Sequence, residues 1–143
     1  MSSTRTSRAA LAVLLLALGA PLHAQSFGFP WWKDAQFQRD LALTAEQTAK
    51  IDAVFQSTIS LLRQKKADLD QQEEDLSRLI AAGTDEALVT RQVDKVESIR
   101  ASMNKMRTLM LLHERQVLTP DQRVRLSKLH EQMVKDRGKP RGR

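Results

Sequence analysis

Apolar residues recur with helical spacing along two long stretches of the chain. The first stretch, residues 44–82, carries Ile51, Val54, Phe55, Leu62, Leu69, Leu76 and Leu79. The second runs to about residue 117 and carries Val89, Val96, Ile99, Met103, Met106, Met110, His113 and Val117. Side chains spaced by three, four or seven residues share one face of an α-helix. Each stretch therefore predicts one long amphipathic helix.

Turn and cap residues separate these helices and add a shorter helix at either end. Gly83 suits the left-handed conformation that ends a helix, and Thr84 suits the cap of the next one. A further apolar pattern follows Thr119 and consists of Leu126, Leu129 and Met133. Residues 31–41 can form a short leading helix, and no segment alternates as a strand. The prediction is an all-α fold, a long antiparallel helical hairpin with short leading and C-terminal helices.

One short motif occurs twice, 75 residues apart, as LTAEQ at residues 43–47 and LTPDQ at residues 118–122. A threonine hydroxyl accepts a hydrogen bond from an N–H at a helix start, and a glutamine three residues later reaches back to the cap, which makes a capping box. Pro120 suits the first helical position and disfavours helical geometry at Thr119, so a sharp bend is expected there. The residues expected to be structural are Leu43, Thr44, Gln47, Leu118, Thr119 and Gln122.

The N-terminal residues have the pattern of a secretory signal. Arg5 and Arg8 precede an apolar run of 12 residues, 9–20, and Ala24 offers a small residue for cleavage. This run is shorter than the roughly 20 residues that cross a membrane as a helix. We therefore expect a signal peptide at residues 1–24, cleaved after Ala24, and a periplasmic protein without stable membrane insertion. The absence of cysteine excludes disulfides, thiolate metal sites and lipid attachment through a thiol.

The excess positive charge lies at the two ends of the chain. The net charge is +6, yet residues 25–134 contain equal numbers of acidic and basic side chains. Residues 135–143 carry five basic residues and one acidic residue, interrupted by glycine and proline, which predicts a disordered basic tail. We expect one helical domain at residues 25–134. Export excludes nucleic acid as a partner of the tail.

Paired L-T-x-x-Q motifs in a small, exported, all-helical chain resemble the Spy/CpxP family of periplasmic proteins. The resemblance extends from Trp31 to about Met133. It implies an ATP-independent chaperone or envelope-stress modulator whose partners are partly folded envelope proteins or the periplasmic domain of a membrane sensor. It also implies an antiparallel, cradle-shaped homodimer. The residues support a dimer independently, because helices of about 58 Å and 50 Å would form a hairpin too thin for a closed core.

A chaperone surface would combine flexible apolar side chains with basic ones. Methionines adapt to varied apolar partners, although at stripe positions they commonly fill cores instead. The candidate client-binding residues are Leu62, Arg63, Lys65, Lys66, Met103, Met106 and Met110. Five of the six aromatic residues precede the hairpin, and they could contact a client, a membrane interface or a partner subunit, or pack on the hairpin as a lid. We expect Trp31, Trp32 and Phe37 to form the lid, and residues 27–30 to be freer.

Metal binding is the alternative function. Thioether and imidazole groups suit a soft or borderline ion, and copper, zinc or nickel would be bound by Met106, Met110, His113 and His130. Two histidines without cysteine make a poor metal cage, and Glu114 and Glu131 lie off the faces concerned. We therefore expect a packed, structural His113 and a solvated His130, and no cofactor. The sequence has no recognisable catalytic constellation, so an enzyme is not expected.

Overall fold

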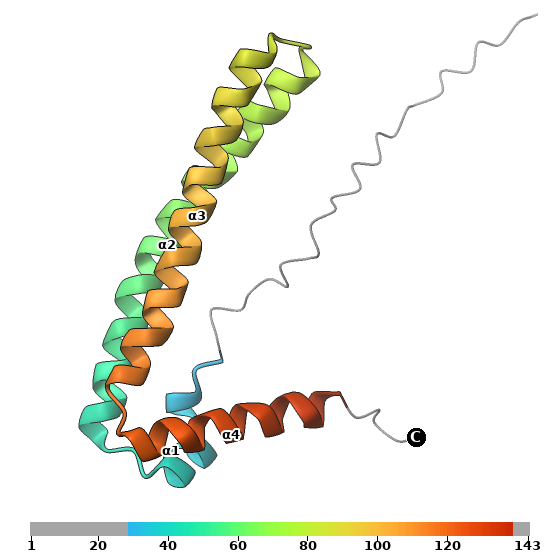
Figure 1. Ribbon diagram of the computed structural model, residues 1–143. Helices are drawn as coiled ribbons and strands as arrows, with labels where there is room; N and C mark the ends of the chain where they lie inside the picture. Colours follow the sequence, from blue (N-terminus) through green and yellow to red (C-terminus); the bar gives the residue numbers. More distant parts are fainter. Residues whose placement is uncertain (1–28, 139–143) are drawn as a thin grey trace, which may run out of the picture.

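The computed structural model describes residues 29–138 (Figure 1). Its elements are the 3-10 helix η1 (Trp31–Lys33) and the α-helices α1 (Ala35–Leu41), α2 (Ala45–Ala81), α3 (Glu86–Gln116) and α4 (Pro120–Arg137). Helices α2 and α3 run antiparallel and form a long shaft, and α4 leaves its lower end at an angle, with α1 and η1 in the corner. Residues 29–138 contain no strand, so the predicted all-α hairpin with two shorter helical segments is confirmed. The signal peptide, Phe27 and residues 139–143 lie outside the described residues.

The leading segment is two short helices rather than the single one predicted for residues 31–41. Asp34 has an extended backbone, with φ −77° and ψ 129°, and caps α1. Its Oδ1 accepts hydrogen bonds from the backbone N–H groups of Gln36 at 2.9 Å and Phe37 at 3.1 Å. Aspartate is a strong N-cap because its carboxylate satisfies such unpaired donors. The break therefore separates the tryptophans of η1 from α1.

The turn at the tip of the shaft differs from the prediction in one detail. Gly83 adopts a left-handed φ of 61°, as expected, and its N–H bonds to the carbonyl of Ile80 at 3.0 Å. Thr84, predicted to cap α3, instead donates its hydroxyl to the carbonyl of Leu79 at 2.7 Å. The cap position of α3 belongs to Asp85, which makes no side-chain cap bond. The backbone N–H of Thr84 bonds to the same carbonyl at 3.3 Å, so the threonine closes the end of α2.

The core is divided between the corner and the shaft. The corner cluster consists of Trp31, Trp32, Phe37, Leu41, Ile51, Leu118 and Leu126. The shaft cluster consists of Ile59, Leu62, Leu69, Val96 and Met103, and Phe55 packs against both clusters. The predicted aromatic lid is confirmed, since its three rings are buried. Of the two motif leucines that were expected to be structural, Leu118 is buried and Leu43 is half-buried against the corner.

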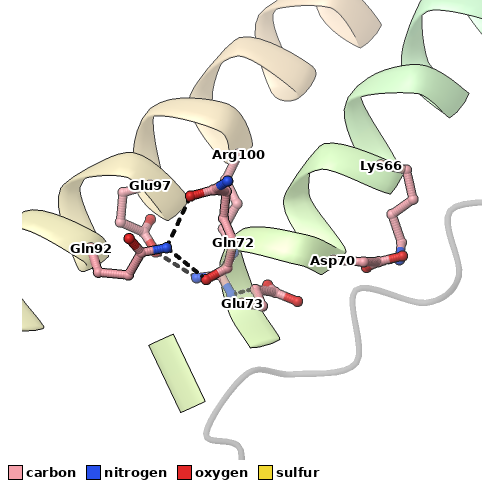
Figure 2. Close-up of polar contacts among 7 residues, drawn as sticks. All are labelled: Lys66, Asp70, Gln72, Glu73, Gln92, Glu97 and Arg100. Atoms are coloured by element: carbon pink, nitrogen blue, oxygen red, sulfur yellow. Dashed lines mark hydrogen bonds and ion pairs between the residues drawn. The ribbon is translucent and has the colours of Figure 1, made fainter. Parts of the chain in front are cut away.

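Polar contacts fix α2 and α3 to each other along the upper shaft (Figure 2). Gln92 of α3 is buried and donates from Nε2 to the backbone carbonyl of Gln72 at 2.9 Å and to its Oε1 at 3.0 Å. Arg100 pairs with Glu73 of α2 and with Glu97 on its own helix. Because the glutamine contact is directional, it helps to set the register of the two helices.

Helix α4 extends further than the sequence indicated. It continues to Arg137, three residues into the stretch that was predicted to be a disordered tail. The basic residues Lys135 and Arg137 lie in its last turn, where cations interact favourably with the helix dipole. None of the described helices is both long enough and apolar enough to cross a membrane.

Candidate functional site

The two LTxxQ motifs form the capping boxes that the sequence predicts. At α2, Thr44 Oγ1 accepts from the Gln47 N–H at 3.1 Å, and Gln47 Oε1 accepts from the Thr44 N–H at 3.1 Å. At α4, the same two bonds between Thr119 and Gln122 measure 3.3 Å and 2.9 Å. Pro120 occupies the first turn of α4. Each motif therefore starts a helix through its own local hydrogen bonds.

The two motifs also bind each other across the corner. Gln47 Nε2 donates to Gln122 Oε1 at 2.8 Å, and Gln122 Nε2 donates to Gln47 Oε1 at 3.1 Å. Each amide uses its second hydrogen to bind a backbone carbonyl at the end of another helix. Gln47 Nε2 donates to the Val117 carbonyl after α3 at 3.2 Å, and Gln122 Nε2 donates to the Leu41 carbonyl at the end of α1 at 3.0 Å. A glutamine amide both donates and accepts, whereas an ionised glutamate only accepts. The paired amides thus join four helix ends, which a pair of carboxylates would not do.

This pairing explains why the motif ends in glutamine at both sites. Because a capping box accepts glutamate or glutamine, each box alone predicts a helix start and no contact between the two motifs. The feature of the sequence that could have indicated this contact is the glutamine that ends both motifs. The family model described as LTXXQ motif family protein matches residues 32–130, which include both motifs.

The chain belongs to the LTXXQ motif family. This is the Spy/CpxP type of protein that the two motifs resemble. No curated protein and no solved structure matches the chain.

Several of the LTXXQ protein's predicted client-binding residues are in its core. Leu62, Met103 and Met110 are exposed by 0%, 3% and 4%, and Met106 is half-buried against the shaft cluster. The methionine stripe therefore follows the alternative interpretation and fills the core, Met103 and Met106 in the shaft and Met110 beside the cavity at the corner. Of the basic candidates, Arg63 and Lys66 are exposed and Lys65 is half-buried. A client could contact the three core side chains only after the hairpin had opened.

Other large apolar side chains are exposed on the shaft. Leu61 of α2 is 51% exposed, and Leu109 and Leu112 of α3 are 39% and 47% exposed. Leu109 and Leu112 lie one turn apart, so their side chains are neighbours on the surface of α3. These leucines lie outside the heptad stripes, so the stripe pattern did not select them as candidates. Their position off the buried stripe is the signal that could have identified them as surface residues.

The four candidate metal ligands do not converge. His113 is exposed and lines an open groove with Gln47 and Lys50, whereas His130 and Met110 line a different cavity. Met106 packs into the shaft. In residues 29–138, no group of three or more histidine, aspartate or glutamate side chains is placed to hold a metal ion.

The expectations for the two histidines were reversed. His113 was expected to be packed, yet it is exposed. His130 was expected to be solvated, yet it is half-buried with its ring centroid 5.7 Å from that of Phe37. The cause is the fold of the corner, because α1 lies against α4, which carries His130, while the side of α3 that carries His113 faces an open groove.

A small cavity at the corner contains a buried carboxylate. Its volume is about 90 Å³, and it is lined by Phe29, Trp31, Trp32, Met110, Leu111, Glu114, Arg115 and His130. Glu114 is only 2% exposed, and this burial raises its pKa to about 7, with Arg115 acting in the opposite direction. Burial, together with Arg115, lowers the pKa of His130. The sequence placed Glu114 away from any site, although it follows Met110 by four residues and so continues the buried stripe.

Proposed function

We propose that this protein is a periplasmic, ATP-independent chaperone or envelope-stress modulator that binds partly folded proteins on the surface of its helical shaft. The observation that carries the proposal is the exposure of large leucine side chains on a rigid shaft that also carries exposed cations. Membership of the LTXXQ motif family supports it. A modulator would use the same surface to bind the exported domain of a membrane sensor.

The surface of α3 is suited to weak and adaptable contacts. Leu109 and Leu112 are adjacent on this helix, and the exposed Lys105 lies one turn before Leu109. On α2, the exposed Leu61 is followed by Arg63. Burying a leucine completely contributes about 1.5–3 kcal/mol, so a few partly covered leucines give reversible binding. The cations would speed the encounter with acidic clients more than they would tighten the complex.

We further propose that two copies associate as an antiparallel, cradle-shaped homodimer. Helix α2 has 37 residues and extends about 55 Å, but α3 is its main packing partner over that length. A shaft that is two helices thick leaves the outward face of each helix without cover. A second copy would bury part of this surface and leave the rest for clients. Sedimentation equilibrium of the purified protein tests this assembly, and a monomer at micromolar concentration would contradict it.

Light scattering from an aggregating client tests the chaperone proposal. The wild-type protein is expected to suppress aggregation at a stoichiometric ratio without nucleotide. The double variant Leu109→Ser/Leu112→Ser should suppress it less, because it removes adjacent apolar contacts from the shaft. Val134→Ser, which changes a 71% exposed apolar residue on α4, is the matched control and should retain suppression. The proposal fails if the wild-type protein leaves aggregation unchanged.

A metal-binding or metal-sensing role is the second candidate. One observation favours it, namely that Met110 and His130 line the same cavity. Calorimetry with copper, zinc and nickel ions tests it, with His130→Ala expected to remove binding and His113→Ala expected to leave it. Affinity weaker than roughly millimolar for all three ions would exclude the role, and loss of binding in His113→Ala alone would place the ion outside this cavity.

A further inference from the structure

Glu114 is a buried carboxylate without a direct partner. Its side chain is 2% exposed, and no residue in the described part of the chain forms a hydrogen bond or ion pair with it. The guanidinium group of Arg115 attracts the Glu114 carboxylate only at longer range. A buried ionised carboxylate is costly unless a cation or donors compensate it. The Glu114 side chain therefore provides an acceptor for a group from outside the chain.

The walls of the cavity are suited to an organic cation. Trp31 and Trp32 both line the cavity, and their rings contact each other edge to face, with centroids 5.7 Å apart and an interplanar angle of 88°. Phe29 also lines the cavity and is 39% exposed, which places it on the side open to solvent. The faces of tryptophan rings attract ammonium groups, and they do so more strongly where water is excluded.

The volume distinguishes an organic cation from a bare metal ion. A cavity of about 90 Å³ corresponds to the liquid volume of about three water molecules, at ~30 Å³ each. The ammonium end of an alkyl chain, about three heavy atoms on this scale, fills such a space, and the rest of a longer chain extends out of the cavity. A metal ion would fill little of it, and the cavity offers Met110, His130 and Glu114 as ligands among mostly aromatic and apolar walls.

The neighbouring charged side chains do not pair with the Glu114 carboxylate, which leaves it available to an added cation. Lys33 of η1 pairs with Asp52 of α2 at 2.9 Å, and Trp32 Nε1 donates to the same carboxylate at 3.1 Å. Burial lowers the pKa of His130, which therefore adds no full positive charge near neutral pH. Arg115 lines the cavity and opposes a second cation. It is half-buried and forms no ion pair with Glu114, so it does not replace the missing partner.

We propose that the corner cavity binds an alkylammonium group, with Glu114 as its counter-ion and Trp31 and Trp32 as its aromatic walls. The group can belong to a free amine or to a lysine side chain of a bound protein. This inference does not depend on the chaperone proposal, because it rests on the lining of the cavity and not on the exposed leucines of the shaft.

Binding is expected to depend on pH in a defined direction. The ammonium group binds the ionised form of Glu114, whose pKa burial raises to about 7. Affinity should therefore rise between pH 6 and pH 8 and level off above that range. An alkylammonium group, like that of lysine with a pKa of about 10.4, stays charged throughout. Below pH 7 binding should release a proton, which calorimetry in buffers of different ionisation enthalpy detects.

Titration of the purified protein with n-butylammonium chloride tests the proposal. Tryptophan fluorescence reports binding, because both tryptophans of the chain line the cavity. Sodium chloride at the same ionic strength is the blank. We expect saturation with a Kd on the order of 1 mM, well within the affinity limit for a ligand of five heavy atoms. A peptide with one lysine, compared with its norleucine counterpart, determines whether the side-chain form also binds.

Three variants assign the effect to the cavity. Glu114→Gln keeps the shape of the side chain and should weaken binding about tenfold or more by removing the charge. Arg115→Gln should strengthen it severalfold. Glu131→Gln, which changes an exposed carboxylate on α4, is the matched control and should bind like the wild type. Near-ultraviolet circular dichroism checks that each variant keeps its packed tryptophans.

Three results would overturn the proposal. They are the absence of a saturable response in folded wild-type protein, equal binding by Glu114→Gln, and a response to silver(I) or copper ions without one to butylammonium. The last result would make the cavity a metal site. A response to butylammonium alone identifies a free amine as the ligand, and a response to the lysine peptide as well identifies the side-chain form. Suppression of client aggregation is measured separately and does not affect these outcomes.

Discussion

The corner and the shaft of this protein are built in different ways. At the corner, chain segments far apart in sequence meet around two tryptophans, and paired glutamine amides join the ends of the helices. Along the shaft, two helices share one apolar stripe, while leucines such as Leu61, Leu109 and Leu112 stay exposed. Within residues 29–138, the corner buries its main apolar side chains against one another, and its buried Glu114 has no direct partner. The shaft leaves apolar surface uncovered, and exposed apolar surface of this kind commonly binds another protein.

The largest effect is expected from a change in the corner core. Trp32 is 1% exposed, packs on Phe55 with ring centroids 4.9 Å apart, and bonds to Asp52. Trp32→Ala should reduce the free energy of unfolding by about 3–5 kcal/mol through lost burial and a residual cavity. Chemical denaturation monitored by circular dichroism measures this change. A loss below about 1 kcal/mol would mean that the corner is not the stable part of the fold.

The amide pair should show the next largest effect. Gln122→Ala leaves the buried carbonyl of Leu41 without its partner, which costs about 1–3 kcal/mol, and it also removes the cap bond to the N–H of the exposed Thr119. Gln47→Ala removes the other half of the pair. In a double-mutant cycle the two changes should couple by about 0.5–3 kcal/mol. Additive effects would show that the two motifs act as independent caps.

The corner should also respond to pH through Glu114. Burial raises the pKa of this carboxyl from its ordinary value of 4.5 to about 7, so the folded state binds a proton more tightly than the unfolded state. This contribution to stability is complete below about pH 4.5 and is lost as the pH rises through 7. The lowered pKa of His130 acts in the opposite direction over the same range, so the contribution of Glu114 is measured as the difference between thermal melts of the wild type and of Glu114→Gln from pH 5 to pH 8. The stability of the wild type relative to Glu114→Gln should fall as the pH rises, and a difference that stays constant would contradict the assignment.

The smallest effect on stability is expected on the shaft. Leu109→Ser/Leu112→Ser changes two exposed side chains, and surface substitutions usually alter stability by about 0.5 kcal/mol or less each. The same variant is expected to lose client binding. Denaturation measured on the protein used for light scattering separates the two effects. A large loss of stability in dilute monomer would show that these leucines pack within the chain.

Local interactions were predictable from the sequence, and contacts between distant segments were not. The capping boxes at Thr44 and Thr119 depend on residues three apart, and the left-handed turn at Gly83 depends on a single residue. The pairing of Gln47 with Gln122 depends on how α1 and α4 meet, which no local pattern specifies. The environments of His113, His130 and Glu114 were missed for the same reason, because other elements decide which side of α3 is covered.

The two remaining errors in the prediction of helix ends each arise from a single residue whose side chain caps a helix in an unexpected way. Asp34 interrupted a segment whose apolar residues suggested one helix, because its carboxylate caps α1. Thr84 lay between two helix ends, and its hydroxyl bonded to the end of α2 rather than to the start of α3. Composition and spacing predict that a cap is present, but the geometry of the turn decides which helix receives it.

Amide hydrogen exchange, measured by mass spectrometry with and without a bound client, tests most directly whether the corner is architecture and the shaft is the binding surface. Without a client, the corner should exchange most slowly and the turn at residues 82–86 most rapidly. Adding the client should slow exchange in α3 around residues 105–112 and leave the two motifs unchanged. New protection confined to η1, α1 and the motifs, with none on the shaft, would contradict the account and identify the corner as the site of client binding.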